Sequence, residues 1–118
     1  MADYTINQLS QAVRNSFAKY AKQGTDHWTW EVAAKDLAYQ IGSLNKVMLQ
    51  LSNHRWADGK SKDALETEFR NELADILAEV LYIASERGID MNVAMDEMVA
   101  DDRRKVSERT QRGQPVSP

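Results

Sequence analysis

The residues best suited to chemistry in this sequence are acids between positions 65 and 86, in the segment LETEFRNELADILAEVLYIASE. Four carboxylates recur there at i, i+4, i+7 and i+11: Glu68, Glu72, Asp75 and Glu79. On a helix these residues share one narrow face, which we call the acidic stripe. The rest of this segment is apolar from Leu73 to Ala84, so we expect the helix to be buried on most sides. Its acids are then solvated in a thin strip, paired with cations, or ligands of a metal ion.

A second polar stripe lies on the preceding helical segment, residues 30 to 51. Its apolar residues recur at core spacing: Leu37, Ile41, Leu44, Met48 and Leu51. Polar residues run beside them, with a lysine one turn on: Asp36, Gln40, Ser43 and Lys46. If the two segments pack antiparallel with their apolar stripes together, the two polar stripes face each other across a groove.

Carboxylates gathered in a partly dry groove repel one another and need a counter-ion. Mg²⁺ suits such a groove because it takes oxygen ligands, keeps several waters and is often completed by substrate phosphates. The expected metal ligands are Glu72, Asp75, Asp36 and Glu79, with Mg²⁺ as the ion or Mn²⁺ in its place. A surface stripe bridged by lysines and arginines is the alternative, and the spacing alone leaves both open.

Composition limits the function classes. The chain has 118 residues, a net charge of −3 and no cysteine. Disulfides and cysteine-based zinc sites are therefore excluded, and bulk charge does not favour a nucleic-acid partner. No apolar run reaches the roughly 18–20 residues of a membrane span, and the first residues lack the order of a signal peptide. We expect a soluble cytoplasmic protein that does not bind membranes.

Capping residues and helix-ending residues along the chain predict four helices and no strand, so we expect an all-α fold. Thr5 and Gln8 fit a capping box that opens a first helix extending as far as Gly24. The long helix of the acidic stripe is expected to begin near Ser61 or Asp63. Residues 1–110 then form one domain, and 111–118 a flexible C-terminal tail.

Three further features mark helix boundaries and packing. Gly88 suits the left-handed end of the third helix, and Asp90 suits the cap of the fourth. Gly42 inside the second helix is expected to permit a close helix approach. Trp28 and Trp30 are expected to cover the core, in preference to forming a stacking surface for a base.

A family resemblance rests on Glu72-Leu-Ala-Asp75 and the following ILAEVLYIASERGID. This stretch resembles the second signature of the MazG-like all-α nucleotide pyrophosphohydrolases. The likeness extends to the leading helix, to Ile41-Gly42-x-Leu44 and to the Gly88-Ile-Asp segment. It implies a four-helix bundle completed by pairing of subunits, as a homodimer or dimer of dimers. It also implies Mg²⁺-dependent cleavage of a nucleoside triphosphate to the monophosphate and pyrophosphate.

The match is incomplete on the second helix, where Gln40 and Ser43 replace the acids of the family's E-x-x-E element. Glu72 and Asp75 carry over as catalytic metal ligands, while Glu79 and Asp36 would complete a remodelled site; Glu68 is expected to be merely solvated. The substrate-binding residues expected are Gln40, Ser43, Lys46 and Lys105. An enzyme is expected, but a non-catalytic relative that binds a nucleotide or a protein partner would show the same loss of acids.

Overall fold

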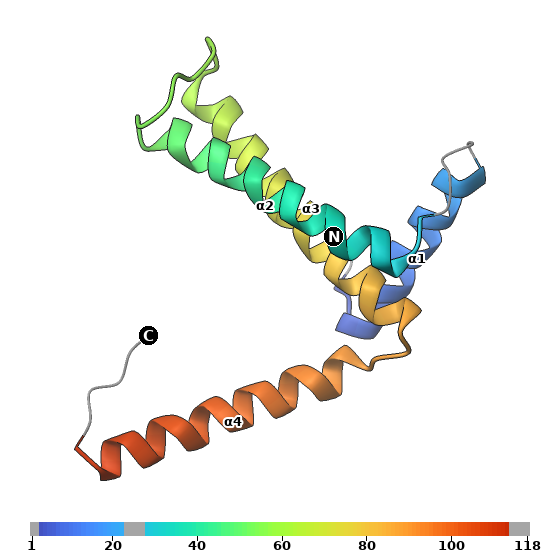
Figure 1. The fold of residues 1–118 in the computed structure, drawn as a ribbon, viewed down its shortest axis with the longest axis vertical. Helices are drawn as coiled ribbons and strands as arrows, with labels where there is room; N and C mark the ends of the chain where they lie inside the picture. Colours follow the sequence, from blue (N-terminus) through green and yellow to red (C-terminus); the bar gives the residue numbers. More distant parts are fainter. Residues whose placement is uncertain (1–2, 23–27, 114–118) are drawn as a thin grey trace.

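A computed structural model describes residues 3–22 and 28–113 of the chain. These residues form helices α1 (Ile6–Lys22), α2 (Trp30–Leu51), α3 (Lys62–Glu86) and α4 (Met91–Gln111), with no strand among them (Figure 1). The predicted all-α class with four helices is thereby confirmed. The expected end of the first helix at Gly24 lies outside the described residues. None of the described helices is both long enough and apolar enough to span a membrane.

Side chains at the helix ends explain where the helices begin and stop. The Thr5 amide donates to Gln8 Oε1 at 2.9 Å, and the Gln8 amide donates back to Thr5 Oγ1 at 3.1 Å. Ser61 caps α3, and Asp90 Oδ1 accepts hydrogen bonds from two amides in the first turn of α4. Gly88, with φ of +66°, ends α3 in the left-handed region. These caps satisfy amides that a helix end otherwise leaves without partners, and all four predictions are confirmed.

The α2–α3 hairpin is the main packing unit, an antiparallel pair joined by the loop 52–61 (Figure 1). Helix α1 packs across one end of it, chiefly against α3, and α4 contacts the rest of the chain chiefly through α1. Phe17 of α1 lies with its ring centroid 4.8 Å from that of Tyr82 on α3 and 6.4 Å from that of Trp28. The Tyr82 hydroxyl donates to the Trp28 carbonyl at 2.7 Å, so Trp28 covers this part of the core as expected. Trp30 lies beneath the Arg87 guanidinium, 4.9 Å from its ring centroid.

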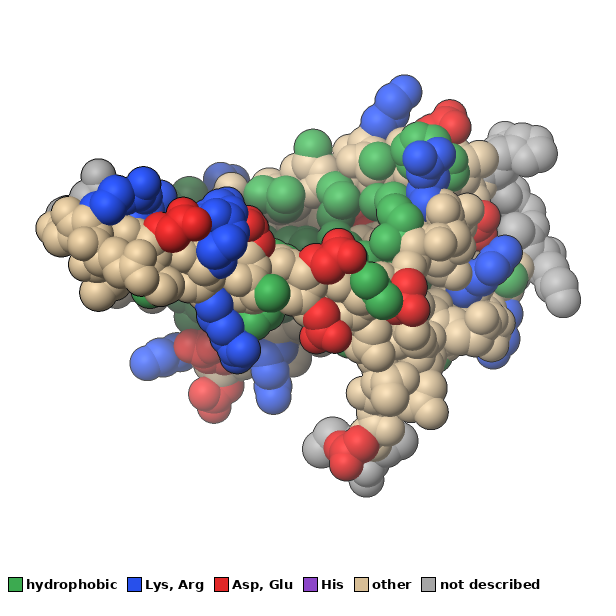
Figure 2. All heavy atoms as spheres, turned by 90° about the horizontal axis from the view of Figure 1, so that it is seen from below, with side chains coloured by type: hydrophobic (Ala, Val, Ile, Leu, Met, Phe, Trp, Pro, Cys, Tyr) green, Lys and Arg blue, Asp and Glu red, His purple; other side chains and the backbone are tan. Residues whose placement is uncertain are grey.

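The chain is more open than a compact domain of its size. Its radius of gyration is 18.3 Å, against about 13.5 Å for a compact chain of this length. Its accessible surface is 9064 Å², against about 6,500 Å² for a compact monomer of this mass. Among the described residues, no large side chain is fully buried. Figure 2 shows hydrophobic side chains gathered on one face between charged ones, so the core of a single chain remains incomplete.

The inner face of α2 differs from the predicted apolar stripe. Ile41 and Met48, expected in the core, are 47% and 49% exposed, whereas Val47 and Gln50 are buried. The helix is rotated so that its polar stripe points toward α3, which moves part of the apolar stripe out to solvent. The prediction that all five apolar residues form the core of the chain is therefore wrong for Ile41 and Met48.

Two related expectations also fail. Leu73 and Leu77 on α3 are 45% and 50% exposed, so this helix is not buried on most sides within a single chain. A Cβ placed on Gly42 meets no described atom within 4 Å, so this glycine does not mark a close helix approach inside the chain. Both errors have the same origin: residue patterns report that a face will be covered, without saying whether the same chain covers it.

Candidate functional site: the polar edge of the helix hairpin

Polar side chains from α2 and α3 line one long edge of the α2–α3 hairpin. We call it the polar edge and define it by Asp36, Gln40, Ser43, Lys46, Gln50, Glu68, Glu72, Asp75 and Glu79, with Lys60 from the loop. The two helices place these residues together because both stripes follow the helical period and the helices run antiparallel. One end of the edge holds acids that touch across the two helices, and the other end opens into a pocket.

At the acid end, Glu79 is buried, with 4% of its surface exposed. Burial, the largest cause, acts together with the hydrogen bond and charge of Asp36 and the charge of Asp75 to raise the pKa of Glu79 from 4.5 to about 8. Gln40 Nε2 donates to Asp36 Oδ2 at 3.3 Å, which orients this carboxylate. Glu79 Oε2 is buried with no hydrogen-bond partner among the described residues. The Glu79 carboxyl group is therefore either protonated near neutral pH or able to bind a cation.

Glu72, two turns before Glu79, occupies the middle of the edge. Burial raises the pKa of Glu72, and the nearby charges of Asp75 and Glu68 raise it further. Its Oε2 is also buried, and no residue in the described part of the chain pairs with it. Two buried carboxylate oxygens on one edge therefore lack partners, which is costly unless a ligand or ordered water satisfies them.

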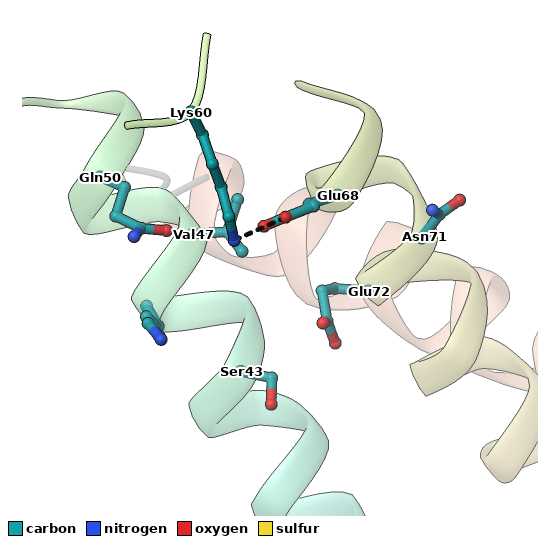
Figure 3. A pocket seen from close by; sticks show the side chains of 8 residues that line it. Ser43, Val47, Gln50, Lys60, Glu68, Asn71 and Glu72 are labelled. Atoms are coloured by element: carbon teal, nitrogen blue, oxygen red, sulfur yellow. Dashed lines mark ion pairs between the residues drawn. The ribbon is translucent and has the colours of Figure 1, made fainter. Parts of the chain in front are cut away.

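The pocket has a volume of about 380 Å³ and is lined by residues of both helices and the loop, among them Ser43, Lys46, Gln50, Lys60, Glu68 and Glu72 (Figure 3). Lys60 Nζ lies 2.7 Å from Glu68 Oε1, so the loop is tied to α3 across the mouth of the hairpin. Glu68 is therefore not merely solvated, as the sequence suggested, because it pairs with Lys60 and lines the pocket.

Gln50 is a site residue that the sequence reasoning missed. It is 2% exposed, and its Nε2 donates to the Trp56 carbonyl at 3.0 Å and to Asp58 Oδ2 at 3.4 Å. Its Oε1 is buried and has no partner within residues 3–22 and 28–113. The sequence contains a signal for this residue, because Gln50 follows Ser43 by seven positions and so continues the polar stripe of α2.

The structure brings most of the predicted site residues together. Those that share the polar edge are Asp36, Gln40, Ser43, Lys46, Glu72, Asp75 and Glu79. Lys105 is not among them, because its Nζ pairs with Asp101 Oδ2 at 2.9 Å on α4. Helix α4 runs away from the hairpin in Figure 1, so within one chain this lysine does not reach the polar edge.

The donor set of the polar edge suits a hard divalent cation, since its unpartnered atoms are oxygens, two from carboxylates and one from the Gln50 amide. The described residues contain no group of three or more histidine, cysteine, aspartate or glutamate side chains close enough to share a metal ion. Glu72 and Glu79 are seven residues apart, which is about 10 Å along a helix. The residues therefore fit an ion held by one or two carboxylates and completed by water and phosphate, as Mg²⁺ commonly is, and do not fit a full protein cage.

Comparisons with known proteins add no assignment. No family model matches the chain, and neither a curated protein nor a solved structure matches it. The function therefore has to be inferred from the acids, the pocket and the open apolar surface described above.

Proposed function

We propose that this protein is a divergent MazG-like nucleotide pyrophosphohydrolase that acts at the polar edge. The reaction is Mg²⁺-dependent cleavage of a nucleoside triphosphate, or a related nucleotide, to the monophosphate and pyrophosphate. The observation that carries the proposal is the pair of buried carboxylate oxygens without partners, on Glu72 and Glu79, of which Glu72 lines a pocket large enough for a small ligand. The resemblance of the Glu72-Leu-Ala-Asp75 segment to the second family signature supports the same reading.

The acids of α3 would hold the cation, with Glu72 and Asp75 as first ligands and Glu79 and Asp36 in support. Mg²⁺ or Mn²⁺, when bound, would offset phosphate charge and make a water more nucleophilic. Asp75 is exposed on the same edge, and we assign its carboxylate to accept a proton from the attacking water.

The phosphates would meet the chain's own polar groups at the centre of the polar edge. Lys46 lines the pocket and supplies positive charge, while the Ser43 hydroxyl and the Gln40 side chain supply neutral contacts. Binding the reacting phosphate next to the carboxylates fixes its position for attack. Such positioning supplies a large part of the rate enhancement in phosphoryl transfer.

A second copy of the chain is the proposed cover of the exposed apolar surface, giving a homodimer or dimer of dimers. The surface exceeds that of a compact monomer by about 2,600 Å². That excess is of the size that obligate homodimers bury. Ile41, Met48, Leu73 and Leu77 are the apolar residues that such a contact would cover.

The hydrolase proposal is tested by incubating the protein with a panel of nucleoside triphosphates and Mg²⁺ or Mn²⁺ while pyrophosphate release is measured. Release is expected for at least one nucleotide and should be lost in Glu72→Gln. The matched control is Asp63→Asn, an exposed acid in the first turn of the same helix and outside the polar edge. Absence of release for every nucleotide, or equal release by Glu72→Gln, would contradict the proposal.

A non-catalytic nucleotide-binding or protein-interaction module is the second candidate. It is favoured by the α2 side of the edge, where Gln40, Ser43 and Lys46 are neutral or cationic. It is also favoured by the lack of a three-acid metal group in the described ranges. Calorimetry separates the two candidates: nucleotide binding that is equally tight with EDTA and with Mg²⁺, and without turnover, would support the second.

A further inference from the structure

We propose that Gln50 is a specificity-determining residue, whose side-chain carbonyl accepts a hydrogen bond from the exocyclic amino group of an adenine or cytosine base. This inference rests on the proposed nucleotide site and adds the class of base that it selects. The Gln50 side chain is 2% exposed, and its Oε1 is directed from α2 toward α3 (Figure 3).

The orientation of this amide is set by its neighbours. Both contacts of the Gln50 Nε2 are with acceptors, the Trp56 carbonyl oxygen at 3.0 Å and Asp58 Oδ2 at 3.4 Å. Rotating the amide by half a turn would place Oε1 against two other oxygens and lose both hydrogen bonds. The nitrogen must therefore face the loop, and the oxygen is turned toward α3 (Figure 3).

An oxygen buried in this way requires a donor. Oε1 has no partner in the described part of the chain, and Lys60, which lines the same pocket, pairs with Glu68 at 2.7 Å. An unsatisfied buried acceptor is costly, so a ligand that brings an N–H group gains more here than one that brings another oxygen. Phosphate oxygens would be repelled by this carbonyl oxygen and by the Glu68 carboxylate, which lines the same pocket. We therefore place the phosphates farther along the polar edge.

The spacing of residues along α2 leaves room for the phosphates at a distance from Gln50. Gln50 follows Ser43 by seven residues and Gln40 by ten, about 10 and 15 Å along the helix. A nucleotide with its phosphates beside Glu72 and Asp75 therefore extends its base toward the loop, where Gln50 lies. The pocket volume of about 380 Å³ is in the range of small-ligand sites.

The surrounding charges match the amino-bearing edge of a base. Adenine and cytosine both carry an amino donor next to a ring-nitrogen acceptor, whereas uracil presents a carbonyl in place of the amino group. With the amino group on Gln50 Oε1, the ring acceptor would face Lys60, whose ammonium keeps further donors beside its ion pair with Glu68. A carbonyl at the same position would meet the Gln50 oxygen directly and be rejected.

The sharpest test changes the ligand and leaves the protein intact. Affinities are measured by calorimetry with Mg²⁺ for two pairs, CTP against UTP and ATP against ITP, in which the second member carries a carbonyl where the first has its amino group. We expect CTP and ATP to bind at least about ten-fold more tightly than their partners, which is about 1.4 kcal/mol. Equal affinity within both pairs would overturn the assignment of Gln50, while pyrophosphate release would still support the hydrolase proposal.

Variants add a second, independent arm. Gln50→Met keeps the length of the side chain and removes the acceptor, so it should lose the preference within both pairs. Asp58→Asn changes the same loop contact and leaves the Gln50 oxygen in place, so it should keep the preference. Retention of the full preference by a folded Gln50→Met protein would overturn the inference. If that variant fails to fold in a thermal melt, the ligand pairs decide alone. Failure of all nucleotides to bind would overturn the proposed function itself.

Discussion

The two edges of the α2–α3 hairpin are incomplete in opposite ways. The polar edge buries carboxylate and amide oxygens, and several of them lack hydrogen-bond partners among the described residues. The other edge, which we call the apolar edge, comprises Ile41, Met48, Phe69 and Leu73; Met48 and Phe69 share a shallow apolar hollow there.

The difference shows what each edge lacks. Buried polar atoms without partners are stabilised by a small ligand, an ion or water, whereas exposed hydrophobic side chains are stabilised by another protein surface. The same pair of helices thus presents a binding groove on one side and an assembly surface on the other.

Removal of one carboxylate from the polar edge should have the largest consequence. Glu72→Gln should lower pyrophosphate release by roughly 100-fold or more, because losing an outer-shell partner of a metal site already costs about 10–100-fold and Glu72 is proposed as a first ligand. The measurement is kcat/KM for the best nucleotide of the panel. A loss of the same size in Asp63→Asn, which lies outside the edge, would indicate a general effect on the helix rather than a role in the site.

A charge on the apolar edge should break the assembly. Met48→Glu places a carboxylate where we expect a second copy, and in a symmetric interface the two new charges come close to each other, which costs several kcal/mol. The expected result is a shift of the sedimenting species from dimer or tetramer to monomer. Tyr39→Glu, at a more exposed position of the same helix, is the control and should leave the mass unchanged. An unaltered mass in Met48→Glu would remove the apolar edge from the interface.

The pH dependence of stability should report on Glu79. Its pKa is raised from 4.5 to about 8 in the folded chain, so between these values the folded state binds more protons than the unfolded state. The free energy of unfolding should therefore fall as pH rises from about 4.5 to 8, by at most about 1.4 kcal/mol per pH unit.

Glu79→Gln removes this titration. In metal-free buffer the variant should show a flatter pH profile, and at pH 8 it should be more stable than the natural chain by roughly 1–3 kcal/mol. Urea unfolding at pH 5 and pH 8 measures both quantities. Parallel profiles for the two proteins would show that the buried carboxyl carries no linked proton. Added Mg²⁺ should raise the melting temperature of the natural chain at pH 8 more than that of the variant.

The smallest effect concerns Gly42. Because a Cβ there meets no described atom within 4 Å, Gly42→Ala should raise the free energy of unfolding by about 0.5–1 kcal/mol through helix propensity alone. Thermal unfolding at one protein concentration measures it. A loss of stability that grows on dilution would instead show that a second copy approaches this glycine, which would extend the apolar edge around α2.

Much of the fold could be predicted from local residue patterns. The caps at Thr5, Ser61 and Asp90 and the left-handed Gly88 were correct because each depends on contacts within one turn of chain. The expectation that two polar stripes share one edge was also correct, because it follows from helical period and antiparallel packing. The rotation of α2 about its axis could not be predicted, since stripes 100° wide leave several pairings of faces equally apolar.

The sequence by itself determined the four helices, their ends and the existence of an acidic stripe, because these depend on neighbours at i+3 and i+4. Only the tertiary structure decided that Asp36 meets Glu79, that Gln50 is buried with a free carbonyl, and that Ile41 and Met48 remain outside. The reason is physical: burial and unmet hydrogen bonds arise from how two helices are rotated against each other. That rotation depends on all the contacts along the hairpin, so no single position in the sequence specifies it.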